Sequence, residues 1–239
     1  ADPARKMMSA GQEAWLAREL GVSVKSGRPW QVIGNEVVMA RLFTPPLHRY
    51  MTAEAYAAAK ADLPRAAANR VAKIEANAAL GLPWGADMWD GYPADRQRFY
   101  GIVEKSHANA IVVSGDSHAF WANELFDAET GGKRVAVEFG TAGITSPGPG
   151  ESIAAFPLGD AFAKYNREVL FNNQTAHGFL LLTLTHAQAT AELIAVSSIK
   201  DKAFTTKPIA TYHVTPGPGG VSALKQALAA VQRQAQPKA

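Results

Sequence analysis

Residues 110–118 read Ala110-Ile-Val-Val-Ser114 and then Gly115-Asp-Ser-His118, and this stretch decides the fold class. The first five residues are short, apolar and flanked by polar residues, which predicts a β-strand buried on both faces. Ligand sites in open α/β architectures form just beyond the carboxyl ends of such strands. The stretch therefore predicts an α/β protein with a binding site in the turn after this strand.

Upstream of this strand, apolar and helix-forming segments alternate. Trp30 to Met39 predicts another strand buried on both faces, interrupted by Gly34-Asn35-Glu36. Residues 52–82 predict a helical pair broken at Pro64. We expect this pair to be a helical insertion packed on the core.

Two further helices are expected in the first half of the chain. One begins with a capping box formed by Ser9 and Gln12 and is expected to end at Gly21. The other begins at Pro93, which fits the first position of a helix. Its apolar stripe consists of Phe99, Ile102 and Val103.

Strands dominate the second half of the chain. Residues 134–139 predict a strand, residues 178–185 and 190–197 an antiparallel hairpin, and residues 209–214 a last strand. Residues 216–239 are expected to form a C-terminal extension with a helix marked by Leu224, Leu228 and Val231. The pattern predicts a mixed sheet or a sheet sandwich flanked by helices.

Composition excludes several classes of protein. The 239 residues carry a formal charge of +3, which is too small to indicate specific nucleic-acid binding. The sequence has no run of eighteen apolar residues, so no membrane span is expected. Cysteine is absent, which excludes disulfides and cysteine-based metal sites. We expect a periplasmic or secreted protein, with which the absence of cysteine is compatible.

The Gly-Asp-Ser-His turn contains two candidate metal ligands. If the chain stays extended, the side chains of Asp116 and His118 point to the same side. A carboxylate and an imidazole that converge on one point are suitable ligands for a metal ion. The alternative is structural: Asp116 caps the turn and His118 is a hydrogen-bonded histidine near the core.

The same residues also fit a serine-esterase mechanism. Gly-Asp-Ser is also the nucleophile motif of one class of serine esterases, with Ser117 as the nucleophile. That class needs a downstream Asp-x-x-His pair to activate the serine, and no such pair follows Ser117 in this sequence. The esterase interpretation therefore ranks below the metal interpretation.

The loop of residues 87–92, Asp-Met-Trp-Asp-Gly-Tyr, is the second candidate region. Asp90 offers a carboxylate, and Trp89 and Tyr92 are candidate walls of a substrate pocket. Arg96, one helical turn further on, is a candidate phosphate contact because a guanidinium binds phosphate bidentately. The alternative is a structural loop, which we prefer for Asp87 and for Trp84 just before it.

Two isolated residues complete the candidates. Asn35 interrupts an apolar strand, and its amide oxygen is a possible ligand for a hard metal ion. His177 begins the predicted hairpin and is close enough in sequence to a strand end to reach an active site. Each is a weak signal alone, since Gly-Asn is common in turns and a lone histidine is more often structural.

Four motifs in order resemble the PhoD-like alkaline phosphatase family. They are Trp30-Gln-Val-Ile-Gly-Asn-Glu-Val-Val-Met39, Asp87-Met-Trp-Asp-Gly-Tyr-Pro-Ala-Asp-Arg96, Val113-Ser-Gly-Asp-Ser-His118 and Val137-Glu-Phe-Gly-Thr-Ala-Gly-Ile-Thr-Ser146. The resemblance extends from about Met8 to about His213. It implies a metallophosphoesterase of four-layer α/β/β/α form that hydrolyses phosphate monoesters and diesters.

The resemblance also implies a cofactor and site residues. Family members use iron and calcium, with zinc or manganese as other possible metals. Asp116 and His118 match positions of metal ligands, and Asn35 and Asp90 match positions at or next to the metal cluster. Glu36 stands where the family more often has Gln. Arg96 and His177 lie in family-like stretches without a firm role.

The first metal-binding motifs of the family have no counterpart here. We therefore expect residues 1–239 to be the C-terminal half of such a phosphatase domain. A second chain, the N-terminal half of the same precursor, is expected to complete the fold and the site. The remaining alternative is a non-catalytic accessory or binding fragment.

Overall fold

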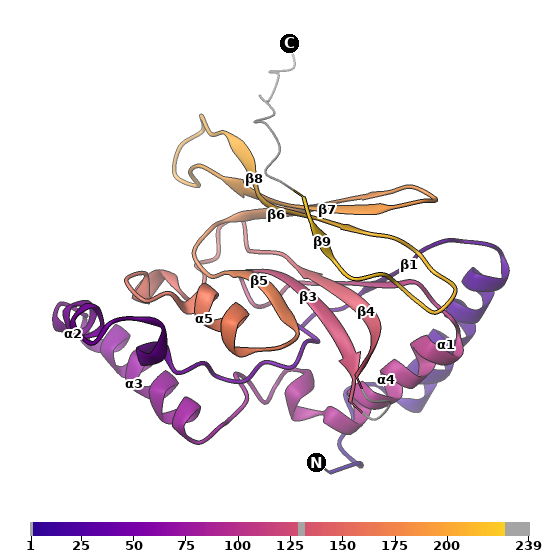
Figure 1. Ribbon diagram of the computed structural model, residues 1–239, viewed down its shortest axis with the longest axis horizontal. Coiled ribbons are helices and arrows are strands. Elements are labelled where there is room, and N and C mark those ends of the chain that lie inside the picture. The colour runs from indigo at the N-terminus through magenta and orange to yellow at the C-terminus, as the bar shows by residue number, and fades with distance from the viewer. Residues whose placement is uncertain (1, 129–131, 228–239) are drawn as a thin grey trace.

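The computed structural model describes residues 2–128 and 132–227, which form two β-sheets and a set of helices. Figure 1 shows the two sheets stacked face to face, with the helices below the first sheet. Within the described residues no helix covers the outer face of the second sheet. The described residues thus form three layers, α/β/β, and the mixed α/β class is confirmed.

The first sheet has five strands in the order β1-β2-β4-β3-β5. Their bounds are β1 Gln31–Gly34, β2 Ala110–Ser114, β3 Phe120–Asp127, β4 Lys133–Gly140 and β5 Val169–Asn173. β1, β2 and β4 run parallel, whereas β3 pairs antiparallel with both β4 and β5. Three carboxyl ends of neighbouring parallel strands therefore meet at one edge of the sheet.

The second sheet is antiparallel, with the order β6-β7-β8-β9. Its strands are β6 Gly178–Leu184, β7 Ala189–Val196, β8 Thr206–Val214 and β9 Lys225–Gln226. β7 alternates strictly between buried and half-buried residues, which is typical of a strand with one face on a core. The buried residues of β7 and β8 pack on Ile111, Phe120 and Phe139 of the first sheet.

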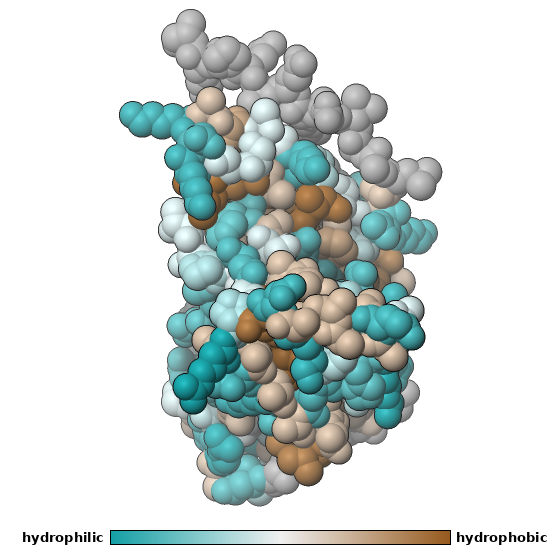
Figure 2. Space-filling model, turned by 90° about the vertical axis from the view of Figure 1, so that its left-hand side faces the viewer, coloured by the Kyte–Doolittle hydropathy of each residue, from teal (hydrophilic) through white to brown (hydrophobic). Residues whose placement is uncertain are grey.

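The helices cover the other face of the first sheet. They are α1 Ala10–Lys25, α2 Ala53–Ala61, α3 Arg65–Ala79, α4 Pro93–Lys105 and α5 Leu158–Tyr165, with short 3-10 turns η1 Leu47–Tyr50, η2 Trp89–Gly91 and η3 Glu151–Ile153. Their core includes Leu16, Val71, Phe99 and Trp121. On the side of the molecule seen in Figure 2, hydrophobic residues form several separate patches among hydrophilic ones.

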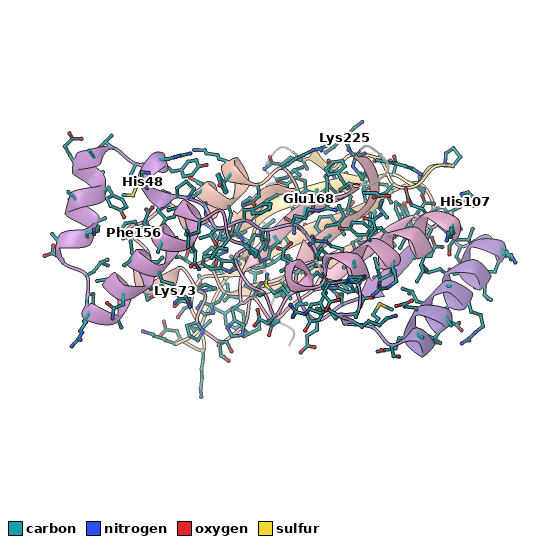
Figure 3. The ribbon with its side chains drawn as sticks, turned by 90° about the horizontal axis from the view of Figure 1, so that it is seen from below. His48, Lys73, His107, Phe156, Glu168 and Lys225 are labelled. Carbon is teal, nitrogen blue, oxygen red and sulfur yellow. The ribbon has the colours of Figure 1, made fainter. Side chains whose placement is uncertain are left out.

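α2 and α3 lie together at one end of the molecule. Figure 3 shows His48, Phe156 and Lys73 of α3 at this end and His107 at the opposite end. Tyr56 of α2 packs edge-on against Phe156, with 5.6 Å between ring centroids. His48 binds Glu75 of α3 through its Nδ1 atom at 2.7 Å. These contacts attach the helical pair to the rest of the chain.

A mostly buried segment without a helix or strand follows β1, and side chains hold its backbone. Five consecutive backbone amides, of residues 39–43, donate to side-chain oxygens. The pairs are Met39 and Ala40 to Glu138, Arg41 to Glu168, Leu42 to Asp90, and Phe43 to Asn166. Burial raises the pKa of the Glu138 carboxyl more than hydrogen bonds from Met39, Asn123 and Ala40 lower it. Buried backbone amides need hydrogen-bond acceptors. Here side-chain oxygens accept these bonds in place of the carbonyls of a neighbouring strand.

Most predicted elements exist, and three predictions are corrected. The predicted strand Trp30 to Met39 is wrong in its second half, because β1 ends at Gly34. β1 is also an edge strand rather than one buried on both faces, and Val32 is 44% exposed. The first helix continues through Gly21 to Lys25.

The predicted C-terminal helix is not observed where the structure describes the chain. Leu224 is buried between the sheets, and Lys225 and Gln226 form β9 beside β8. Leu228 and Val231 lie outside the described residues.

Candidate active site

The loops that follow the parallel strands β1, β2 and β4 meet at one edge of the first sheet. The Asn35 amide donates to the Val113 carbonyl at 2.9 Å, and the Gly115 amide donates to the Glu36 carbonyl at 3.0 Å. On the other side of β2, the Thr141 amide donates to the Ser114 carbonyl at 2.9 Å. The Gly-Asp-Ser-His turn is therefore held between the two neighbouring loops, as expected for the carboxyl edge of parallel strands.

The turn is bent rather than extended, which corrects the predicted geometry. Asp116 has φ 52° and His118 has φ 51°, and both side chains are exposed. Only one other described non-glycine residue, His107, has positive φ. Non-glycine residues in this region cost of order 1–3 kcal/mol each and are concentrated at functional sites. Two such residues in one turn mark it as a candidate site.

Asp116 and His118 line the same cavity, of about 460 Å³. The bend thus brings together the pair that an extended chain was expected to align. Other lining residues come from α3, from β3, from the loops at 84–88 and 147–152, and from the residue after β5. They include Arg70, Trp84, Asp87, Trp121, Glu151 and Gln174.

His118 has one ring nitrogen fixed by a backbone carbonyl. Its Nδ1 atom lies 3.1 Å from the Pro147 carbonyl oxygen, which accepts only from a protonated Nδ1. The neutral ring then carries its lone pair on Nε2. Metal-binding histidines usually have this arrangement, in which a carbonyl or carboxylate orients the non-ligating nitrogen.

Asn35, Trp89 and Tyr92 line a second cavity, of about 530 Å³. The Asn35 side chain connects the loop after β1 to the loop of residues 87–92. Its Oδ1 accepts from Trp89 Nε1 at 3.2 Å, and its Nδ2 donates to the Val37 carbonyl. Trp89 is buried, and the Arg5 guanidinium lies 4.6 Å from the Tyr92 ring centroid. Asp87 lines both cavities. The predicted substrate-binding aromatics thus lie beside the Asp116 cavity and not in its wall.

Asp90 and Arg96 bind each other. Arg96 Nη1 lies 2.7 Å from Asp90 Oδ1, and their side chains are only 5% and 9% exposed. Arg96 also donates to the Met39 carbonyl, and Asp90 accepts from the Leu42 amide. Neither residue lines the cavity of Asp116 and His118. This geometry favours a structural role over the predicted catalytic roles.

His177 lies directly before β6, with both ring nitrogens next to acceptor atoms. Its Nδ1 is 3.2 Å from the Gly143 carbonyl oxygen, and its Nε2 is 3.1 Å from Glu151 Oε1. Glu151 lines the cavity, so His177 contacts the site through it. Both ring nitrogens thus contact acceptor atoms of the protein, and His177 itself does not line the cavity. We therefore assign His177 to positioning Glu151.

Ser117 has no activating base among the described residues. Its hydroxyl oxygen accepts a hydrogen bond from Trp121 Nε1 at 2.9 Å. The neighbouring His118 is bound through Nδ1 to the Pro147 carbonyl instead. This arrangement gives the serine-esterase alternative no support.

A complete metal site is not formed within residues 2–128 and 132–227. These residues contain no group of three or more His, Cys, Asp or Glu side chains that could hold a metal ion. The turn supplies one carboxylate and one oriented imidazole. The donor chemistry of Asp116 and His118 fits part of a metal site, but further ligands are needed.

Sequence reasoning missed several residues that line the cavity. Asp87 is predicted to be structural, and no sequence prediction covers Arg70, Glu151 or Gln174. No motif marks them, because they come from a helix, a Gly- and Pro-rich loop and a strand end far apart in the sequence.

Among the described residues, the helices are too short or too polar to span a membrane.

The sequence and the fold are both similar to those of known proteins. The chain is 28% identical over 194 residues to alkaline phosphatase D of Bacillus subtilis (strain 168), covering 80% of this chain and 27% of that protein. A solved structure described as the structure of PhoD matches with a TM-score of 0.67 at 22% identity, covering 97% of this chain and 37% of that one. The chain therefore spans only 27% to 37% of the length of these relatives.

The model of the PhoD-like phosphatase family matches residues 1–193. This range contains the strained turn, both neighbouring loops and the cavity that they line. The chain belongs to the PhoD-like phosphatase family.

Proposed function

We propose that this chain forms part of the active site of a phosphoric-ester hydrolase, an alkaline phosphatase or phosphodiesterase. One observation carries the proposal: the strained Asp116–His118 turn lines a cavity at the carboxyl edge of three parallel strands. Family membership gives the reaction class. Water attacks phosphorus, the bond to the ester oxygen breaks, and the alcohol leaves with a proton.

Asp116 and His118 are proposed to be metal ligands through a carboxylate oxygen and Nε2. A bound metal ion would supply a Lewis acid and a water of lowered pKa. The proposed metals are iron and calcium, with zinc and manganese as alternatives. The Pro147 carbonyl holds the His118 ring in the orientation this role requires. Asn35 remains a predicted ligand, and its backbone amide donates to the Val113 carbonyl of β2, next to the turn.

The remaining ligands are proposed to come from a companion chain, the N-terminal half of the same precursor. Two facts support this proposal: the described residues lack a third ligand, and the chain covers only 27% of one relative and 37% of another. A companion would also supply the fourth layer of the α/β/β/α sandwich. The proposed location is periplasmic or secreted.

Replacing Asp116 and His118 together with alanine tests the assignment. We expect the native assembly to lose bound metal and at least about a hundredfold in hydrolysis of a phosphate ester, with little loss of stability because both side chains are exposed. Metal content is measured by native mass spectrometry, and stability by thermal unfolding. Retention of full metal content and activity would contradict the proposal.

A matched control removes the same two side-chain types elsewhere. Asp62 and His186 are both exposed and lie away from the lining residues, so Asp62→Ala with His186→Ala should change neither metal content nor rate. If the unmodified native assembly contains no metal, the non-catalytic binding fragment becomes the better interpretation. Covalent labelling of Ser117 by a serine-directed phosphonate would instead support the esterase.

A further inference from the structure

We propose that Arg70 of α3 is a specificity-determining residue that binds a second anionic group on the alcohol part of the substrate. The proposal rests on the function proposed above and adds a substrate class to it. Arg70 lies in the helical pair outside the sheets, yet its side chain lines the cavity that contains Asp116 and His118.

The position of Arg70 follows from the packing of α3. Ala67, Val71 and Ile74 of the same helix are buried against the core. This anchors the helix and leaves Arg70 exposed beside the cavity. Its Nη1 atom is 3.3 Å from the Ser152 hydroxyl, which belongs to the loop on the cavity wall. The helix and the loop therefore hold the guanidinium at the cavity.

Charge identifies the kind of ligand. Arg70 is the one Lys or Arg among the described residues lining the cavity, whereas Asp87, Asp116 and Glu151 are acidic. Within the described ranges no ion pair joins Arg70 to a carboxylate, and its one side-chain partner is the Ser152 hydroxyl. A guanidinium with free donors binds carboxylate or phosphate groups with strong, charge-assisted hydrogen bonds.

Two other residues that line the same cavity suit an organic ligand. Trp84 presents an aromatic ring, held by an edge-on contact with Phe162 at 4.9 Å. Gln174 is only 3% exposed, and its Nε2 donates to Asn172 Oδ1 at 2.7 Å. Its Oε1 is a buried acceptor without a partner among the described residues, and such an acceptor needs a hydrogen-bond donor. An apolar surface, an acceptor and a cation together suit an alcohol that carries an anionic group.

The test compares phenyl phosphate with its para-carboxylate analogue in the native assembly. Arg70→Ala should raise KM for the carboxylated substrate about tenfold, which corresponds to one lost charge-assisted contact. KM for phenyl phosphate and kcat for both should stay within about twofold of the original protein. Arg70→Lys should recover part of the lost affinity, because lysine keeps the positive charge but lacks the planar bidentate donors of the guanidinium.

Arg65→Ala is the matched control, because Arg65 lies on the same helix, is exposed and does not line the cavity. The inference would be overturned if Arg70→Ala raised KM equally for both substrates, or left KM unchanged for both.

A binding measurement separates the two proposals. Trp84 and Trp121 line the cavity, so their fluorescence should report binding of the carboxylated substrate. If the native assembly binds it through Arg70 but hydrolyses neither substrate, the proposed hydrolase fails and the anion contact stands. If Arg70→Ala leaves the binding affinity unchanged, the anion contact fails whatever the rate of hydrolysis.

Discussion

Arg96 and Asp90, two motif residues with predicted catalytic roles, bind each other and the nearby backbone. Both side chains are almost fully buried, and together they hold the backbone at Met39 and Leu42. Removing one partner of a buried pair leaves an uncompensated charge. We expect Arg96→Met to lower the free energy of unfolding by about 3–5 kcal/mol, measured by urea denaturation.

The double variant distinguishes pairing from catalysis. Asp90→Leu with Arg96→Met removes both charges and should recover part of the stability lost by Arg96→Met alone. If Arg96 instead contacts substrate phosphate, Arg96→Met would reduce activity while leaving the urea midpoint unchanged.

The site could be predicted only in part at the level of single residues. Asp116 and His118 were found because they directly follow a recognisable strand. Their left-handed φ angles were not foreseen, since neither residue is glycine and spacing carries no information on this strain. Arg70 and Glu151 reach the cavity through tertiary packing, which a local pattern does not encode.

Asp95, in the first turn of α4, attaches the segment before α1 to this helix. Its carboxylate accepts hydrogen bonds from the amides of Met7 at 2.5 Å and Met8 at 2.7 Å, and from Arg98. Burial alone would raise the pKa of Asp95, but the amides of Met8 and Met7 and the Arg98 side chain hold the pKa below its usual 3.8. The ionised carboxylate therefore stabilises the contact between α4 and the segment before α1.

The sign of the pH dependence follows from the depressed pKa. Such a carboxylate contributes stability above the pKa of the unfolded chain and loses it as pH falls through the folded pKa. Asp95→Asn should reduce the free energy of unfolding near neutral pH by about 1–3 kcal/mol. The difference between the two proteins should shrink only as pH falls below 3.8.

Chemical denaturation at neutral pH and at several pH values from about 4 down to about 2 measures both free energies. Asp160→Asn is the control, because Asp160 occupies the first turn of α5 but is exposed. An Asp95→Asn effect that does not change with pH would show that the charge of the carboxylate is not what matters.

Elements with strong local signals were predicted well, and those defined by tertiary contacts were not. The strand β2, the hairpin of β6 and β7, and the start of α4 at Pro93 are confirmed. β3, β5 and α5 were missed. Polar residues Asn123, Glu124 and Asn172 are buried in β3 and β5. Buried polar residues obscure an apolar pattern, because tertiary hydrogen bonds rather than hydrophobicity make their burial possible.

At the scale of the whole molecule, the second sheet has an apolar outer surface at one edge. β6 is an edge strand, and its Leu180 and Leu182 pack inward on the core between the sheets. Alternation places Phe179 and Leu181 on the opposite face, where each is 40% exposed. An exposed apolar edge strand is a site where another chain can pair. It is where we expect the proposed companion chain to dock.

Charged substitutions on this face test that arrangement. Phe179→Lys with Leu181→Lys should weaken association with the companion chain by about a hundredfold or more, since each buried apolar side chain contributes about 1.5–3 kcal/mol. Thr183→Lys is the control, because Thr183 lies on the same face of β6 but offers little apolar surface to a partner. Sedimentation velocity of the mixed chains measures the association. A native assembly with the mass of this chain alone, or equal association for all the variants, would show that β6 is not where a companion docks.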